Sequence, residues 1–176
     1  MKFIIGSDIH GSLKYAKNFF ERAEESEADQ IILLGDLYYC GARNDPPEEY
    51  SPKECVALLN SYAERIIAVK GNCESEVDSM VSKFGIYETS FLYVFGKKIF
   101  LAHGHKEGFE KHPRADIVFQ GHTHVSVLTN GDGAILANPG SISIPKDGTH
   151  SYMVMDETGI RLYDLISGEL LREVLF

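Results

Sequence analysis

The sequence predicts an α/β protein in which helices cover a mixed or partly parallel β-sheet, or two such sheets. Short apolar runs rich in Ile, Val, Leu and Phe recur along the chain, and each has about the length of a strand. Segments with helical periodicity lie between the early runs, and the second half consists mainly of strands. Most runs are continuously apolar, which is typical of sheets that are covered on both faces.

Eight apolar runs are the predicted strands. They are KFII (2–5), QIILLGD (30–36), RIIAVKGN (65–72), KKIFLAHGH (97–105), ADIVFQGHTH (115–124), AILANPG (134–140), SYMVMDE (151–157) and IRLYDLI (160–166).

Three segments are the predicted helices. Residues 12–25 place an apolar stripe on one face, with Ser12 available as the N-cap. Residues 52–65 repeat this pattern, and Pro52 suits a first helical turn. Residues 75–84 form a shorter third helix.

The composition indicates one domain of ordinary size, which we place at residues 1–176. Hydrophobic residues make up 44% of the chain and charged residues 24%, which is ordinary globular usage. No apolar run has the length of a signal-peptide core or a membrane span, so we expect a soluble, cytoplasmic protein without a membrane partner. The net charge of -9 disfavours nucleic acid as a tight partner, because neutralising phosphates requires a clustered basic surface.

Residue types that bind metals stand where five of the predicted strands end. Glycines at positions 6, 35, 71, 104 and 121 accompany them and permit close approach of the backbone to a ligand. Ligands bind beyond the carboxyl ends of strands in α/β sheets, so these side chains could all face one place. The set consists of Asp8, His10, Asp36, Asn72, His103, His122 and His124.

The chemistry of this set is that of a metal centre. Two carboxylates, four imidazoles and one amide oxygen suit divalent Mn, Fe, Ni or Zn, and the odd number of cysteines without a C-x-x-C pair argues against a thiolate site. Seven ligands exceed the needs of one ion but divide between two ions that share a carboxylate. One D-x-H or G-N motif alone is usually a turn, but seven such residues in order after apolar runs are hard to explain as turns.

The motifs resemble those of a known family. The order D-x-H, G-D, G-N-x-E, H-G-H and G-H-T-H over residues 8–124 resembles the calcineurin-like metallophosphoesterase superfamily. The segments SDIHG, LLGDLYYCGARN, VKGNCESEVD and NPGSISIPKDG resemble its small bacterial and archaeal phosphodiesterase group. The resemblance implies a four-layer αββα sandwich of two mixed β-sheets flanked by helices. It also implies an ion held by Asp8, His10 and His124, a second held by Asn72, His103 and His122, and Asp36 bridging both.

The implied activity is hydrolysis of a small phosphodiester by a metal-bound hydroxide. Two divalent ions, first of all Mn²⁺ with Fe, Ni or Zn as alternatives, would supply the positive charge that binds phosphate to an acidic chain. Two other functions stay open: a phosphomonoesterase acting on nucleotides or small metabolites, and a non-catalytic protein-interaction scaffold of the same fold. The scaffold role usually accompanies loss of the metal-binding histidines, and all four are present here.

One position departs from the superfamily pattern. Much of the superfamily has His after G-N, where it is thought to protonate the leaving group, whereas this chain has Cys73, a weak donor whose pKa should fall beside dications. The candidate catalytic residues are therefore Asn72, Cys73 and His105, and His105 is a replacement acid, a substrate contact or only a surface histidine. Cys73, His105 and Arg43, which lies in the long loop 38–51, are the candidates for substrate binding.

Two further features leave alternatives open. Glu74 either orients its neighbourhood or caps the helix that begins near residue 75. The apolar tail LLREVLF, residues 170–176, either completes the core or forms a contact in a homo-oligomer.

Overall fold

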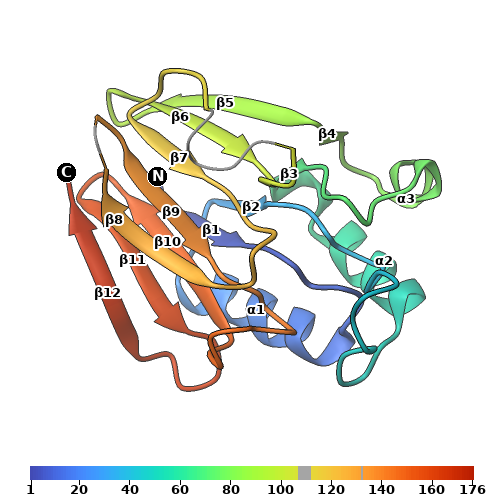
Figure 1. Cartoon of the computed structure of the whole chain (residues 1–176). Helices are drawn as coiled ribbons and strands as arrows, with labels where there is room; N and C mark the ends of the chain where they lie inside the picture. The colour runs from blue at the N-terminus through green and yellow to red at the C-terminus, as the bar shows by residue number, and fades with distance from the viewer. Residues whose placement is uncertain (107–111, 132) are drawn as a thin grey trace.

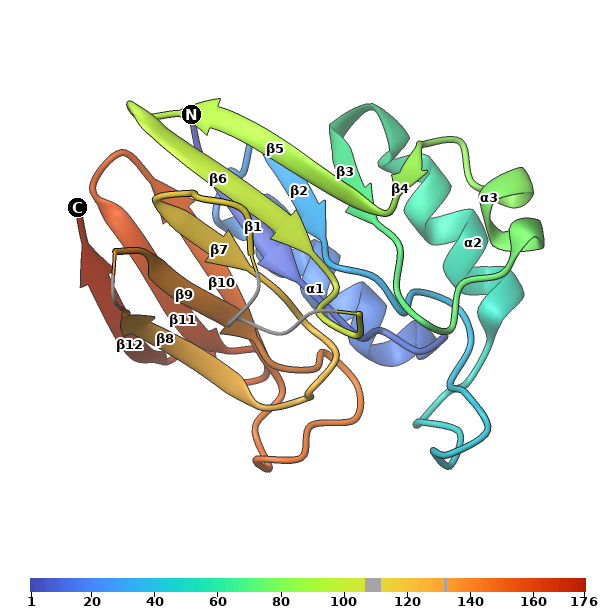
Figure 2. The ribbon, with the colours of Figure 1, turned by 45° about the horizontal axis from the view of Figure 1, so that its top comes forward.

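The computed structural model describes residues 1–106, 112–131 and 133–176, and they form two mixed β-sheets packed face to face (Figures 1 and 2). The seven-stranded sheet has the order β12 (Leu170–Leu175), β11 (Gly159–Asp164), β10 (Ser151–Asp156), β1 (Phe3–Gly6), β2 (Gln30–Leu33), β3 (Ile66–Val69) and β4 (Ile86–Tyr87). The five-stranded sheet has the order β5 (Thr89–Val94), β6 (Lys97–Ala102), β7 (Ile117–Phe119), β9 (Ile135–Pro139) and β8 (Ser126–Asn130). The predicted sandwich of two mixed sheets with flanking helices is confirmed.

The direction of the strands brings several strand ends to one side of the molecule. In the seven-stranded sheet β1, β2, β3 and β4 are parallel, while β10, β11 and β12 join them by antiparallel pairing. In the five-stranded sheet β6, β7 and β9 are parallel, and β5 and β8 are antiparallel edge strands. The segments that leave β1, β2, β3, β6 and β7 therefore start from the carboxyl ends of parallel strands.

The helices agree with the sequence prediction in place but not always in length. Helix α1 spans Leu13–Glu25, and the Ser12 hydroxyl accepts a hydrogen bond from the Tyr15 N–H at 3.4 Å. Helix α2 spans only Pro52–Ser61, and a separate 3₁₀ turn, η1, covers Ala63–Arg65. Helix α3 spans only Glu76–Val81, because none of its side chains is buried and packing therefore supports no longer helix.

Two layers of apolar contact explain why the strands are continuously apolar. On the outer face of the seven-stranded sheet, Phe19 and Phe20 of α1 pack with Ile4 and its neighbours, together with residues of α2. On the inner face, Ile5 and other residues of this sheet pack against the five-stranded sheet, including Phe119. Successive residues of a strand point to opposite faces, so β1 and β2 need apolar side chains on both.

The sequence prediction omitted four strands. These are the short β4, the strands β5 and β8, and β12 in the C-terminal tail. Strand β12 pairs with β11, and Val174 packs against the cluster between the sheets, so the tail extends the sheet. Among the described residues, no helix is long and apolar enough to cross a membrane.

Candidate functional site

All seven predicted metal-site residues lie at the carboxyl ends of the strands that precede them. Asp8 and His10 follow β1, Asp36 follows β2, Asn72 follows β3, His103 follows β6, and His122 and His124 follow β7. Six of their side chains form two adjacent groups of three, and within each group the potential ligand atoms lie within 4.8 Å of one another. Five of the seven residues are buried, whereas His122 is half-buried and Asn72 is exposed.

The first group contains Asp8, His10 and His124. Oδ1 of Asp8 lies 3.2 Å from Nε2 of His124 and 3.5 Å from Nε2 of His10, and the two Nε2 atoms are 3.1 Å apart. A backbone carbonyl fixes the orientation of each ring. Nδ1 of His10 forms a hydrogen bond with the Tyr39 carbonyl, and Nδ1 of His124 forms one with the Ile144 carbonyl, both at 2.8 Å. Since a carbonyl accepts, Nδ1 carries the proton and Nε2 is left facing the group.

The second group contains Asp36, His103 and His122. Nδ1 of His103 donates to the Leu34 carbonyl at 2.6 Å, so its Nε2 also faces inward, 3.5 Å from Oδ2 of Asp36. Oδ1 of Asn72 lies 3.3 Å from the same Nε2. This group therefore presents imidazole nitrogens, a carboxylate oxygen and an amide oxygen to one point.

Asp36 stands between the two groups. Its Oδ2 lies 3.7 Å from Nε2 of His10 in the first group and 3.5 Å from Nε2 of His103 in the second. Its Oδ1 accepts a hydrogen bond from the Cys73 backbone N–H at 2.8 Å, which fixes the carboxylate. The predicted bridging residue is thus in a position to serve both groups.

The donor set fits divalent ions. Within the described residues, the buried Oδ1 of Asp8 has no hydrogen-bond partner, although Oδ2 accepts from the Ser7 hydroxyl at 2.6 Å and from the His122 N–H at 2.9 Å. Beside this oxygen, the Nε2 atoms of His10 and His124 lie 3.1 Å apart. A carboxylate oxygen and two imidazole nitrogens that converge in this way are donors that suit a divalent cation.

The pKa values are shifted as expected for strongly coupled charges. Burial works to raise the pKa of Asp8, but the neighbouring imidazoles of His10 and His124 and the charge of His103 outweigh it and hold that pKa far below its usual range. Burial works to lower the pKa of His103, but its hydrogen bond with Asp36 and the charge of Asp8 raise it to about 9. Without an ion, the His103 imidazole is therefore protonated on both nitrogens, and positively charged, near neutral pH. Burial, followed by the charge of His103, lowers the pKa of His122.

The backbone at the site is strained. Five candidate ligands have φ in the left-handed region: Asp8 (56°), His10 (49°), Asp36 (54°), His122 (67°) and His124 (59°). Such conformations cost about 1–3 kcal/mol each and persist only where the surroundings enforce them. Hydrogen bonds between the loops supply that restraint, from the Asp8 N–H to the Gly35 carbonyl and from the His10 N–H to the Asp36 carbonyl.

Glu74 organises the loop that carries Asp36. Its buried carboxylate accepts hydrogen bonds from the N–H groups of Asp36 (2.9 Å), Leu37 (2.6 Å) and Gly71. Burial, followed by the charge of Asp36, raises the pKa of Glu74. The N-cap of α3 is Ser75, so the orienting role is the correct one of the two alternatives for Glu74.

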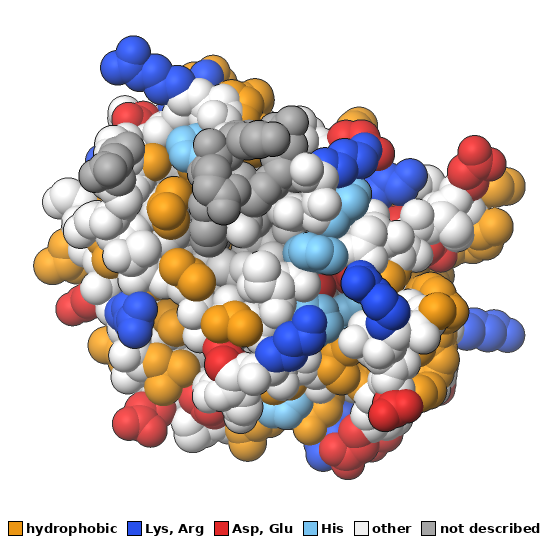
Figure 3. Space-filling view, viewed as in Figure 1, with side chains coloured by type: hydrophobic (Ala, Val, Ile, Leu, Met, Phe, Trp, Pro, Cys, Tyr) orange, Lys and Arg blue, Asp and Glu red, His pale blue; other side chains and the backbone are white. Residues whose placement is uncertain are grey.

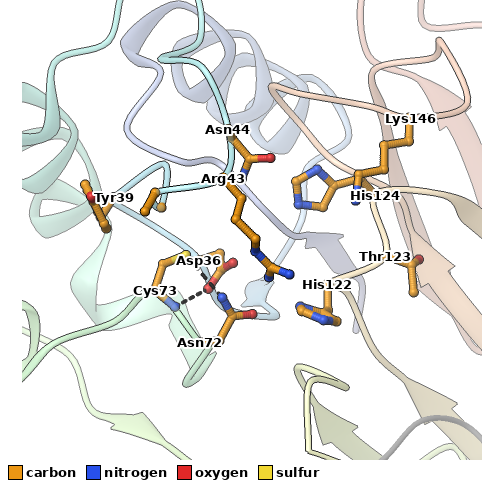
Figure 4. Close-up of a pocket in the computed structure, with 12 residues that line it drawn as sticks. Asp36, Tyr39, Arg43, Asn44, Asn72, Cys73, His122, Thr123, His124 and Lys146 are labelled. Atoms are coloured by element: carbon orange, nitrogen blue, oxygen red, sulfur yellow. Dashed lines mark hydrogen bonds between the residues drawn. The ribbon is translucent and has the colours of Figure 1, made fainter.

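A pocket of about 720 Å³ opens over the two groups and contains several predicted residues (Figure 4). Arg43 and Cys73 line it together with Asn72 and His122. Lys146 also lines it, and the sequence prediction did not single out this residue, although it stands in the segment NPGSISIPKDG. Figure 3 shows histidine side chains exposed beside Lys and Arg side chains on this face.

His105 and Cys73 differ in their relation to this pocket. The His105 ring lies 5.4 Å from that of His103 and 6.1 Å from that of His122, but His105 lines a separate cavity with Phe100. Cys73 belongs to a third possible ligand group, with His10 and Asp36. Without ions, burial and then the charge of Asp36 raise the pKa of the Cys73 thiol, so the predicted lowering by dications stays a prediction.

Comparison with known proteins agrees with this geometry. Residues 1–159 match the family model described as the calcineurin-like phosphoesterase superfamily domain. The chain is 37% identical to phosphodiesterase YfcE of Escherichia coli over 99% of this chain and 97% of that protein. The solved structure of E. coli YfcE superposes with a TM-score of 0.96 and covers 99% of both chains.

More distant relatives share the fold. The chain is 28% identical to the probable metallophosphoesterase YsnB of Bacillus subtilis over 97% of this chain and 95% of that protein. Vacuolar protein sorting 29 of Cryptosporidium parvum has a TM-score of 0.69 at 20% identity, over 99% of this chain and 98% of that one, a likeness of fold alone. The family model and the 37% identity over nearly the whole chain place this protein in the calcineurin-like phosphoesterase superfamily.

Proposed function

We propose that the chain is a phosphodiesterase that hydrolyses small phosphodiesters with two divalent ions, of which Mn²⁺ is the first expectation. The observation that carries the proposal is the unpartnered Oδ1 of Asp8 between two inward-facing imidazole nitrogens. The activity of the relative YfcE, a phosphodiesterase, supports the choice of a diester substrate.

The resemblance to the superfamily implies how the candidate ligands divide between the two ions. Asp8, His10 and His124 would hold one ion, Asn72, His103 and His122 the other, and Asp36 both. When bound, such ions neutralise phosphoryl oxygens and lower the pKa of water to near neutrality, which supplies a nucleophile without a protein side chain.

The residues of the chain prepare the site for this chemistry. The depressed pKa values of Asp8 and Asp36 keep both carboxylates ionised, and the backbone carbonyls behind the rings fix the tautomers of His10, His103 and His124. Arg43 and Cys73 line the pocket where the substrate would lie, and His105, which lines a separate cavity, stays a candidate for a replacement acid or a substrate contact. A cytoplasmic location, a homo-oligomer and a single domain over 1–176 stay predictions.

Elemental analysis joined to activity tests the proposal. The purified protein, loaded with Mn²⁺, is assayed on an aryl phosphodiester and the matching monoester before and after chelation. We expect two bound equivalents, faster hydrolysis of the diester, and loss of activity on chelation that added Mn²⁺ restores. Fewer than one equivalent of Mn²⁺ bound per chain, with no hydrolysis of either ester, would contradict the assignment as an enzyme. Faster hydrolysis of the monoester than of the diester would favour the phosphomonoesterase alternative.

A further inference from the structure

We propose that the substrate carries a second phosphate group, which Arg43 and Lys146 bind together from two different loops that line the pocket. This inference rests on the proposed function, because it names the class of phosphodiester that the same site takes. Figure 4 shows the Arg43 guanidinium directed toward Asn72 and His122, and Lys146 beside His124. The two cations therefore face the pocket from different loops.

Among the described residues, neither Arg43 nor Lys146 forms a salt bridge with a carboxylate. Glu48, in the loop that carries Arg43, pairs instead with Lys14 at 2.7 Å. Asp147, next to Lys146, accepts hydrogen bonds from the Ser126 N–H at 2.7 Å and the Ser126 hydroxyl at 2.8 Å. Glu48 and Asp147 thus have other partners, and neither pairs with Arg43 or Lys146.

Both loops hold these cations at the pocket rim. The Asn44 amide donates to the Cys40 carbonyl at 2.7 Å and closes the turn that contains Arg43. The Lys146 N–H donates to the His124 carbonyl at 2.9 Å, which ties the lysine to a candidate ligand. Two exposed, flexible side chains are in this way anchored at their backbones while their charged ends remain free.

The charges at the site indicate a role for Arg43 and Lys146. Two divalent ions carry more positive charge than Asp8 and Asp36 remove, and the surplus already exceeds the single negative charge of a phosphodiester. Arg43 and Lys146 therefore add positive charge that the scissile group does not require. A guanidinium fork and an ammonium together suit a phosphate, whose oxygens accept bidentate and single hydrogen bonds. The pocket volume of about 720 Å³ admits a ligand of nucleotide size.

A matched pair of chromogenic substrates tests the inference. The p-nitrophenyl ester of thymidine 5′-phosphate has one phosphate, and the same ester with an added 3′-phosphate has two. We expect the Mn²⁺-loaded protein to show a kcat/KM ratio of about tenfold in favour of the second ester, from charge-assisted contacts. The double variant Arg43→Gln with Lys146→Gln should bring this ratio to about one, and each single variant should lower it part of the way.

The control variant Lys53→Gln removes an exposed charge on α2, outside the pocket, and should keep the wild-type ratio. A ratio near one in the wild type, or a ratio that survives the double variant, would overturn the inference. Calorimetric binding of adenosine 3′,5′-bisphosphate and of AMP to the metal-free protein supplies a second readout. The bisphosphate should bind more tightly, and the double variant should abolish the difference. If neither ester is hydrolysed, the proposed function fails and this binding comparison alone decides the inference.

Discussion

At the scale of the residue, Cys73 occupies the place where much of the superfamily has a proton-donating histidine. It lines the pocket, and its Sγ lies within 4.8 Å of ligand atoms of His10 and Asp36. A thiol donates weakly, so we expect the leaving group to receive little help from a proton. The reaction should therefore depend strongly on how stable the leaving anion is.

A series of aryl phosphodiesters measures this dependence. We expect log kcat to fall steeply as the pKa of the leaving phenol rises. Cys73→His should flatten the slope and accelerate the poorest leaving group by about 10²-fold, the lower range for a general acid. Cys73→Ser, which restores no good acid, serves as the control and should keep the steep slope. A slope near zero in the wild type would contradict the role given to Cys73.

The sequence was most informative about the identity of the individual site residues. Residue type and the i, i+2 spacing predicted which seven side chains meet, because these depend on local chemistry and strand geometry. The left-handed φ of Asp8 or His124 was not predictable, since only contacts between distant loops enforce it. The role of Lys146 depends in the same way on a loop that folds back to His124.

At the scale of the element, Glu74 joins the end of β3 to the loop after β2. Its carboxylate accepts three backbone N–H groups, from Asp36, Leu37 and Gly71. Glu74→Ala would leave these buried donors without a partner. Each buried N–H group without a partner costs about 1 kcal/mol or more, so the three together should lower the free energy of unfolding by about 3 kcal/mol.

Urea denaturation of the metal-free protein checks this prediction. Glu76→Ala, an exposed glutamate in the first turn of α3, is the matched control and should change the free energy by no more than about 0.5 kcal/mol. Similar losses in both variants would show that Glu74 does not organise the loop.

Helices and strands were predictable from the sequence where their side chains are buried, because buried positions are apolar. The buried strands β1 and β2 are continuous apolar runs, and α1 has a full apolar stripe with a cap. Strand β5 alternates between half-buried and exposed residues, and most of β12 is exposed, so neither gives that signal. Helix α2 ends at Ser61 although its periodicity continues, because the chain there turns into η1 and β3.

At the scale of the whole molecule, metal binding should govern stability. Each ion that binds the folded chain alone stabilises it by about 2.7 kcal/mol when its concentration is 100 times the Kd. For a chain of this size, the gain from each ion raises Tm by about 5 to 10 °C. Thermal unfolding monitored by circular dichroism with and without Mn²⁺ measures the shift, and an unchanged Tm would contradict it.

The pH dependence of this shift follows from His103. In the metal-free protein, its raised pKa contributes stability that is present below the ordinary value of 6.5 and is lost as the pH rises through about 9. An ion must displace that proton, so binding weakens about tenfold for each pH unit below 9. The Mn²⁺-induced rise in Tm should accordingly be larger at pH 8 than at pH 6. An equal rise at both values would exclude a protonated His103.

The order of the strands was the least predictable property of the whole molecule. Local patterns predicted α/β layers, but not that β10 pairs antiparallel with β1 across most of the chain length. That pairing depends on which apolar faces meet after collapse, which no short segment encodes. The resemblance to the superfamily, rather than periodicity, implied the two packed sheets.

We expect His122 and His124, two residues apart, to serve different ions joined through Asp36. Anomalous diffraction from Mn²⁺-loaded crystals locates the ions and so tests this division of the ligands. The wild type should show two peaks, one beside Asp8 and His10 and one beside His103, with Asp36 between them. His124→Ala should lose mainly the first peak and His122→Ala mainly the second. A single peak in the wild type, or equal loss of both peaks in each variant, would contradict this division of the ligands.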